Sequence, residues 1–200
     1  MMNSMNIIGV GGRDRSGKDT VAELLMENGW FGYSFGDAVR RHAMKRHANE
    51  PDPISVKNMT ETSNWLRSTY GPDVILKEAL EAYDAEQQKG KNYKGIVLFS
   101  VRAPIEADFI LKQGGELVWV ESSDQVRHER RLANIRAGEA KVTLEEMLAQ
   151  EALQADPQPG IPVEVQMDLN YVKSKATIVI ENNGNDLNTF HTNIQKALKI

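Results

Sequence analysis

The sequence predicts an α/β fold in which helices cover both faces of a five-stranded parallel sheet. Two observations lead to this prediction. Short apolar segments, typical of buried strands, alternate with segments of helical periodicity over the whole chain. A glycine-rich loop follows the first apolar segment and opens an amphipathic helix. The predicted strands are residues 6–10, 31–35, 95–101 and 116–122, and residues 176–184 are predicted to form a last strand that ends in an Asn-Asn-Gly turn.

The composition is that of a single globular domain. The chain has 200 residues, of which 40% are hydrophobic and 26% charged, and its net charge of −4 argues against a broad nucleic-acid surface. Cysteine is absent, which excludes disulfides, thiolate metal sites and a cysteine nucleophile. Because no apolar run approaches the ~20 residues of a membrane span and no secretory signal is recognisable, we expect a cytoplasmic protein without membrane partners.

The first third of the chain alternates regularly between strand and helix. The segment 17–28 has helical apolar spacing, and Gly29 stands where a C-cap glycine belongs. The alternating segment 31–35 is the second strand. Asp37 is then expected to cap a helix that runs to about His47.

The middle of the chain contains two further helices and the most apolar strand. Thr60 is expected to cap the first helix, which ends near Gly71, and the second follows Pro72. The run 95–101 is apolar throughout, as a central parallel strand should be. Pro104 suits the first turn of the next helix.

The last third is less regular. After the strand 116–122, Asp124 begins an arginine-rich helix, and a capping box begins another at Thr143. Residues 137–174 fit no simple alternation. Asp186 is expected to cap a terminal helix with Leu187, Phe190, Ile194 and Leu198 on its apolar face.

The loop at residues 11–20 has the spacing of a phosphate-binding loop. Gly12 is followed after four residues by Gly17 and Lys18. Glycines let several backbone N–H groups point at one anion, the helix N-terminus adds its dipole, and the lysine adds a charge for the β and γ phosphates. The predicted nucleotide-binding residues are Gly12, Arg13, Asp14, Arg15, Ser16, Gly17, Lys18, Asp19 and Thr20.

Asp19 departs from the pattern of such loops. The residue after the lysine is usually Ser or Thr, whose hydroxyl binds Mg²⁺. A carboxylate at this position could bind the metal directly or through water. It could equally be a first-turn carboxylate that the helix dipole stabilises, and the sequence leaves the two open.

Five segments in the same order resemble a known group of enzymes. They are RSGKDT at 15–20, FGDAVRR at 35–41, LRSTYGPDVI at 66–75, SVRAPIEADFI at 100–110 and VESSDQVRHERR at 120–131. This set resembles the phage-type deoxynucleoside monophosphate kinases, with some segments similar to dephospho-CoA-kinase-like proteins, all within the superfamily of P-loop nucleoside monophosphate kinases.

The resemblance implies a three-layer P-loop kinase fold that binds ATP and Mg²⁺. It implies one domain over residues 1–200, with an acceptor-binding insertion at 37–92 and a lid at 127–174. The catalytic cations it implies are Lys18, Arg102, Arg130 and Arg136. The acceptor-binding residues would be Asp37, Arg40, Arg41, Arg67 and Arg102, and the lid helix would also contribute Arg127 and Arg131.

The third strand ends without the aspartate that helps to hold Mg²⁺ in this superfamily. Its last residues are Phe99, Ser100 and Val101. We hypothesise that Asp19 and Ser100 exchange the usual hydroxyl and acid roles around the metal. The alternative is that Ser100 marks a weakened or lost activity.

Three functions therefore follow from the sequence. The first is ATP-dependent phosphoryl transfer to a nucleoside or deoxynucleoside monophosphate. The second is phosphorylation of dephospho-CoA or another small molecule on a hydroxyl, for which Asp37 would be the general base. The third is a non-catalytic nucleotide-binding regulator. The sequence does not identify the base or sugar of the acceptor, and it leaves the oligomeric state open, a homodimer included.

Overall fold

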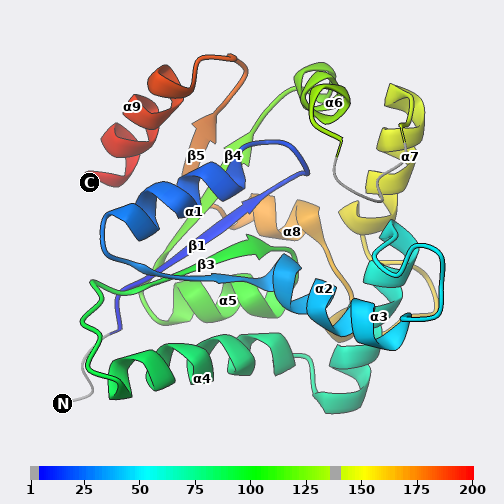
Figure 1. Cartoon of the computed structure of the whole chain (residues 1–200), viewed down its shortest axis with the longest axis horizontal. Helices are drawn as coiled ribbons and strands as arrows, with labels where there is room; N and C mark the ends of the chain where they lie inside the picture. The colour runs from blue at the N-terminus through cyan, green and yellow to red at the C-terminus, as the bar shows by residue number, and fades with distance from the viewer. Residues whose placement is uncertain (1–4, 136–140) are drawn as a thin grey trace.

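The computed structural model describes residues 5–135 and 141–200, and its centre is a parallel five-stranded sheet (Figure 1). The strand order is β2-β3-β1-β4-β5, with all neighbours parallel. The strands are β1 (Ile7–Gly12), β2 (Phe31–Ser34), β3 (Ile96–Val101), β4 (Glu116–Glu121) and β5 (Ile178–Glu181). The predicted fold class and all five predicted strands are confirmed.

Helices connect the strands and pack on both faces of the sheet. They are α1 (Lys18–Glu27), α2 (Phe35–Arg46), α3 (Val56–Tyr70), α4 (Val74–Gln88), α5 (Pro104–Lys112), α6 (Asp124–Ala133), α7 (Leu144–Ala155), α8 (Leu169–Ser174) and α9 (Leu187–Leu198), with a 3₁₀ turn at Val163–Val165. None of the helices in the described parts of the chain is long and apolar enough to cross a membrane.

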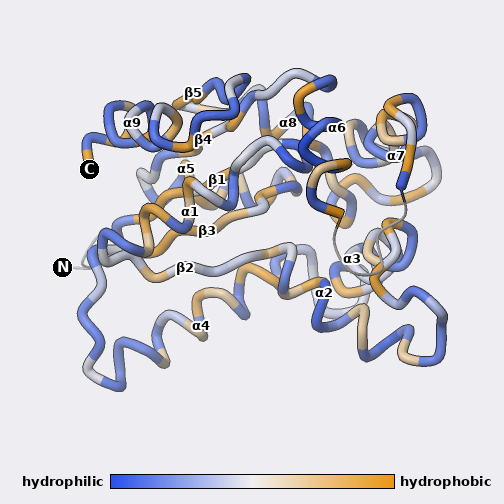
Figure 2. Tube along the Cα trace, turned by 45° about the horizontal axis from the view of Figure 1, so that its top comes forward, coloured by the Kyte–Doolittle hydropathy of each residue, from blue (hydrophilic) through white to orange (hydrophobic). Residues whose placement is uncertain are grey.

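Alternate residues of the three central strands, β1, β3 and β4, point into two separate cores. Ile8 and Val10 of β1 pack with α1 and α9, whereas Ile7 packs on the other face, where α4, α5 and α8 lie (Figures 1 and 2). The same alternation appears in β4, since Val118 and Trp119 belong to different cores. This burial on both faces explains why the central strands are apolar throughout.

Two helices begin earlier than the sequence analysis predicted. The α2 N-cap is Ser34, whose hydroxyl accepts the N–H of Asp37, so Asp37 lies in the first turn instead of capping it. The α3 N-cap is Ser55 and not Thr60, which lies within the helix. In both cases a serine that precedes the predicted cap in the sequence accepts a first-turn N–H group, so the helix begins there.

The terminal helix α9 is capped as predicted, and only part of its apolar face is buried. The carboxylate of Asp186 accepts the N–H groups of residues 188 and 189. Phe190 and Ile194 are buried, whereas Leu187 in the first turn is largely exposed. The capping box at Thr143 is confirmed at the start of α7.

Candidate functional site

The loop between β1 and α1 lies at the carboxyl edge of the sheet. Gly17, the N-cap of α1, has a φ of 102°, and Arg15 has a φ of 63°. A side chain at Gly17 would also place its Cβ 2.4 Å from the amide nitrogen of Asn182. The N-cap glycine has no side chain to cap α1, so the start of this helix is open to an anion approaching along its axis. This is the backbone arrangement of an anion-binding helix N-terminus.

An open hollow of about 340 Å³ adjoins this loop. It is lined by Arg15, Gly17, Lys18, Asp19, Thr20, Arg130, Ala133 and Asn134. Lys18 is only 3% exposed, and its ammonium lies 3.9 Å from a carboxylate oxygen of Asp19. The structure therefore places two helices, α1 and α6, and three cationic side chains around one hollow.

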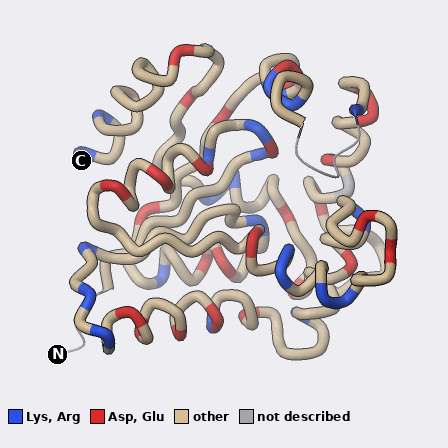
Figure 3. Tube along the Cα trace, in the orientation of Figure 1, with Lys and Arg blue, Asp and Glu red and all other residues tan. Residues whose placement is uncertain are grey.

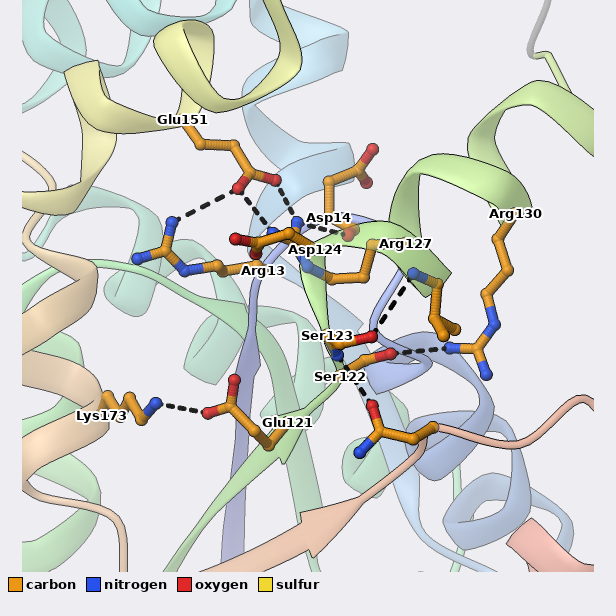
Figure 4. A network of polar contacts seen from close by, with 12 residues as sticks. Arg13, Asp14, Glu121, Ser122, Ser123, Asp124, Arg127, Arg130, Glu151 and Lys173 are labelled. Carbon is orange, nitrogen blue, oxygen red and sulfur yellow. Dashed lines mark hydrogen bonds and ion pairs between the residues drawn. The ribbon is translucent and has the colours of Figure 1, made fainter. Parts of the chain in front are cut away.

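Arg130 of α6 connects the loop to two strand ends. Its guanidinium donates to the carbonyl oxygens of Arg15 and Ser16, to the hydroxyl of Ser122 at 3.3 Å, and to Asn182 (Figure 4). Across the described residues, the hydrogen-bond partners of Arg130 are all neutral oxygens. Burial lowers the pKa of Arg130, because desolvation disfavours the charged guanidinium.

Arg127, three residues earlier on α6, has a different environment. Its side chain is fully buried and is ion-paired with Glu151 of α7 and with Asp124 (Figure 4). One nitrogen also donates to the carbonyl oxygen of Asp14 at 3.2 Å. Burial opposes its charge, but the hydrogen bonds that Arg127 donates to both carboxylates outweigh burial and raise the pKa of Arg127. The predicted ligand role of Arg127 stays a prediction, and so does that of buried Arg131. Arg136 lies outside the described residues.

On the acceptor side, three of the four predicted cations are paired with carboxylates. Arg40 is ion-paired with Asp37 within the first turns of α2. Arg41 reaches Glu78 of α4 at 2.7 Å and the hydroxyl of Tyr33 at 3.1 Å. The structure thus brings Asp37 and Arg40 together, whereas Arg41 contacts the α4 side.

Arg67 and Arg102 meet at one carboxylate. The guanidinium of Arg67, 3% exposed, lies 2.7 Å from Glu106, which is 2% exposed. The other oxygen of Glu106 accepts the backbone N–H of Arg102 at 2.9 Å. The side chain of Arg102 instead donates to Gln154 of α7. Glu106 therefore ties the buried Arg67 to the end of β3, and the acceptor roles of both arginines stay predictions.

Ser100 occupies a strained position at the end of β3. Val10 pairs with Phe99 and Gly11 with Val101, so Ser100 is an extra residue in the β3 ladder, and its φ is 61°. Such a bulge with a left-handed non-glycine residue is costly and is common beside functional sites. The side chain of Ser100 lies against Gly36: a Cβ on that glycine would be only 3.3 Å from the Ser100 hydroxyl oxygen.

The proposed metal ligands Asp19 and Ser100 differ in their position. Asp19 lines the hollow with Thr20, and its side chain is 46% exposed, whereas Ser100 is not among the lining residues. Within the described ranges there is no cluster of three or more His, Asp or Glu side chains that could hold a metal alone. Mg²⁺ in phosphate sites normally keeps several waters and uses one or two protein ligands, so Asp19 and Thr20 fit that role beside phosphates.

Sequence reasoning missed several residues of this site. Glu151 and Gln154 lie on a helix that the sequence marks only by its capping box, and nothing in their spacing points to partners more than 20 residues away. Asn182 follows β5 and donates to the carbonyl oxygen of Ser16 at 2.8 Å. The Asn-Asn-Gly turn signalled a loop there but not its contact with the phosphate loop.

Several solved structures of similar fold bear the names of small-molecule kinases. Shikimate kinase from Bacteroides thetaiotaomicron aligns with a TM-score of 0.55 at 10% identity, covering 98% of this chain and 99% of that chain. A gluconokinase from Sinorhizobium meliloti aligns with a TM-score of 0.51 at 16% identity, covering 97% and 91%. Dephospho-CoA kinase from Campylobacter jejuni gives 0.50 at 16% identity, covering 97% and 96%. These likenesses show the fold, and the strand order and loop define it as a P-loop kinase fold.

Sequence relatives give the family. The chain is 31% identical over 133 residues to a UPF0200 protein of Methanococcus vannielii, covering 66% of this chain and 68% of the relative. It is 27% identical over 128 residues to a UPF0200 protein of Pyrobaculum aerophilum, covering 63% of this chain and 64% of that relative. The protein belongs to the UPF0200 family, and it spans about two thirds of the length of these relatives. No family model matches the chain.

Proposed function

We propose that this protein transfers the terminal phosphoryl group of ATP to a nucleoside or deoxynucleoside monophosphate. The observation that carries the proposal is the hollow at the N-terminus of α1. It is lined by Lys18, Arg15 and Arg130, and the described partners of Arg130 are neutral oxygens. An arginine held by carbonyl and hydroxyl groups keeps its positive charge available to an anion.

The residues around the hollow fit the needs of phosphoryl transfer. Such reactions depend mainly on positioning and on neutralising the charge of the transferred group. The amides at the start of α1 and the ammonium of Lys18 would hold the triphosphate, while Arg130 would neutralise oxygens from the α6 side. A monophosphate acceptor is already an anion at neutral pH, so its attack needs no general base.

Mg²⁺ would be held on the Asp19 side of the hollow. Asp19 and Thr20 both line it and offer a carboxylate and a hydroxyl. When bound, the ion supplies positive charge to the phosphate oxygens. The exchange of roles between Asp19 and Ser100 remains our hypothesis for the missing strand aspartate. If this hypothesis is right, Asp19→Ala should raise the Mg²⁺ concentration that supports half-maximal turnover by at least about tenfold. An unchanged half-maximal Mg²⁺ concentration would reject it.

The acceptor would lie on the β3 side, within the proposed insertion 37–92, and the proposed lid is 127–174. Arg102 lies at the carboxyl end of β3, and its side chain donates to Gln154 of α7. The same helix contacts the phosphate loop through Glu151. Asp37 and Arg40 lie in the first turns of α2. Arg40, Arg41 and Arg67 would serve the acceptor only by leaving their carboxylate partners, so we rank Arg102 first among the proposed acceptor ligands.

One experiment tests the proposal directly. Thermal melting is followed with ATP, with and without Mg²⁺, and turnover is followed as ADP release against a panel of nucleoside and deoxynucleoside monophosphates. A ligand that binds only the folded chain raises its melting temperature. We expect one monophosphate to support turnover and Lys18→Met to reduce it by about a hundredfold or more. ATP stabilisation without turnover on any acceptor would favour a nucleotide-binding regulator instead.

A second candidate transfers the phosphoryl group to a hydroxyl. The carboxylate of Asp37 is 54% exposed and is held by Arg40 in the same turn of α2, where a base could reach an incoming hydroxyl. Asp37→Asn separates the two candidates. A loss of about a hundredfold in turnover supports a hydroxyl acceptor, whereas a nearly unchanged rate supports a phosphate acceptor.

A further inference from the structure

Two arginines of α6 hold three consecutive carbonyl groups of the phosphate loop. Arg127 donates to the carbonyl oxygen of Asp14 at 3.2 Å, and Arg130 donates to those of Arg15 at 3.2 Å and Ser16 at 3.5 Å. These hydrogen bonds to α6 fix the direction in which the carbonyl groups of residues 14–16 point, and therefore the orientation of their peptide planes. The shape of the loop therefore depends on where these two guanidinium groups are held.

Arg127 is itself positioned by a helix outside the nucleotide hollow. Glu151 of α7 binds both terminal nitrogens of Arg127, one of them at 2.9 Å, and the side chain of Arg127 has no exposed surface. A planar carboxylate that meets a planar guanidinium at two points restricts its orientation more than a single contact does.

Glu151 also contacts the loop directly. The same carboxylate lies 3.3 Å from Arg13, the residue after Gly12, and is itself 10% exposed (Figure 4). Glu151 thus connects two points of one loop: Arg13 by a direct ion pair, and Asp14 through Arg127. Glu151 does not line the hollow, so nothing in this arrangement requires it to touch nucleotide.

From this geometry we propose that Glu151 is a positioning residue for the phosphate loop. It holds Arg13 and Arg127 so that the loop amides keep the conformation that binds a triphosphate, and it thereby couples α7 to the nucleotide site. The statement about triphosphate rests on the proposed function, whereas the statement about loop shape does not.

The test compares Glu151→Gln with two matched controls in the full chain. Glu145→Gln makes the same substitution at an exposed position of α7. Ile75→Val removes a methyl group from the buried face of α4, away from the loop, and controls for a general loss of stability. Hydrogen exchange of the amides at residues 13–17 is measured without ligand, and ATP affinity is measured by thermal shift. If Glu151→Gln does not fold, Glu151→Asp keeps the charge with a shorter reach.

We expect at least tenfold faster exchange of the loop amides in Glu151→Gln and a roughly tenfold weaker ATP affinity, with the KM for ATP rising more than kcat falls. Both controls should leave loop exchange unchanged. Loop exchange in Glu151→Gln equal to that in Ile75→Val would overturn the proposal. Tighter ATP binding would overturn it too, because it would show that Glu151 competes with phosphate. If the unmodified protein binds no ATP, the proposed function fails, while the ligand-free exchange still decides whether Glu151 positions the loop.

Discussion

Arg130 on the phosphate side of the carboxyl edge differs from three arginines of the acceptor side in the kind of group that holds it. On the phosphate side, Arg130 is held by neutral oxygens beside a hollow. On the acceptor side, Arg40, Arg41 and Arg67 each meet a carboxylate. Basic residues gather on α2 and acidic residues on α4, so the charges of this side largely compensate within the protein (Figure 3). An arginine thus indicates a ligand site only when the chain itself leaves its charge uncompensated.

The buried pair of Arg67 and Glu106 gives the largest expected effect. Arg67→Met leaves the Glu106 carboxylate without its counter-ion in the core. Breaking a buried pair in this way typically costs about 3–5 kcal/mol, and we expect that loss in the free energy of unfolding measured by urea denaturation. The double variant Arg67→Met, Glu106→Gln should recover most of it, because both charges are then gone while the amide oxygen can still accept the backbone N–H groups of residues 102 and 103. A single variant as stable as the parent would show that the pair carries no structural role.

Arg130 and Arg41 provide the sharpest test of the comparison itself. Arg130→Ala should weaken ATP binding by about 10- to 100-fold, equivalent to about 1.4–2.7 kcal/mol, because a guanidinium at the hollow is lost. Arg41→Ala is the matched control and should change ATP affinity less than about twofold, since its charge is already met by Glu78. Isothermal titration with ATP measures both. Equal losses of ATP affinity in the two variants would mean that a neutral or a carboxylate partner makes no difference to whether an arginine binds ATP.

The smallest effect concerns pH and Glu78. Burial would raise its pKa, but hydrogen bonds from Tyr33, His42 and Arg41 outweigh burial and lower the pKa of Glu78 in the folded state. Its contribution to stability is therefore present above the unfolded-chain value of 4.5 and is lost as the pH falls through the lower folded value. Glu78→Gln should lower the melting temperature at pH 7 by only about 2 °C, and the difference should shrink as the pH falls from 4.5 through the lower folded value. A difference that persists in acid would point to packing and not to charge.

The phosphate loop and the strands could be predicted because their signals are local. A strand buried on both faces must be apolar, and a loop that curls around an anion needs glycines at Gly12 and Gly17, so both features are written into adjacent residues. The helix starts at Ser34 and Ser55 were missed since several nearby residues could cap, and only the course of the preceding chain selects one.

The sequence alone determined the α/β class, the loop with Lys18 and the row of arginines along the carboxyl edge. Only the tertiary structure decided which arginines remain available, because the partner of a long charged side chain is chosen by helices distant in the chain. Glu106 reaches Arg67 across 39 positions and Glu151 reaches Arg127 across 24. Charge pairing at that separation depends on how α3, α5, α6 and α7 pack, and no local pattern of residues encodes it.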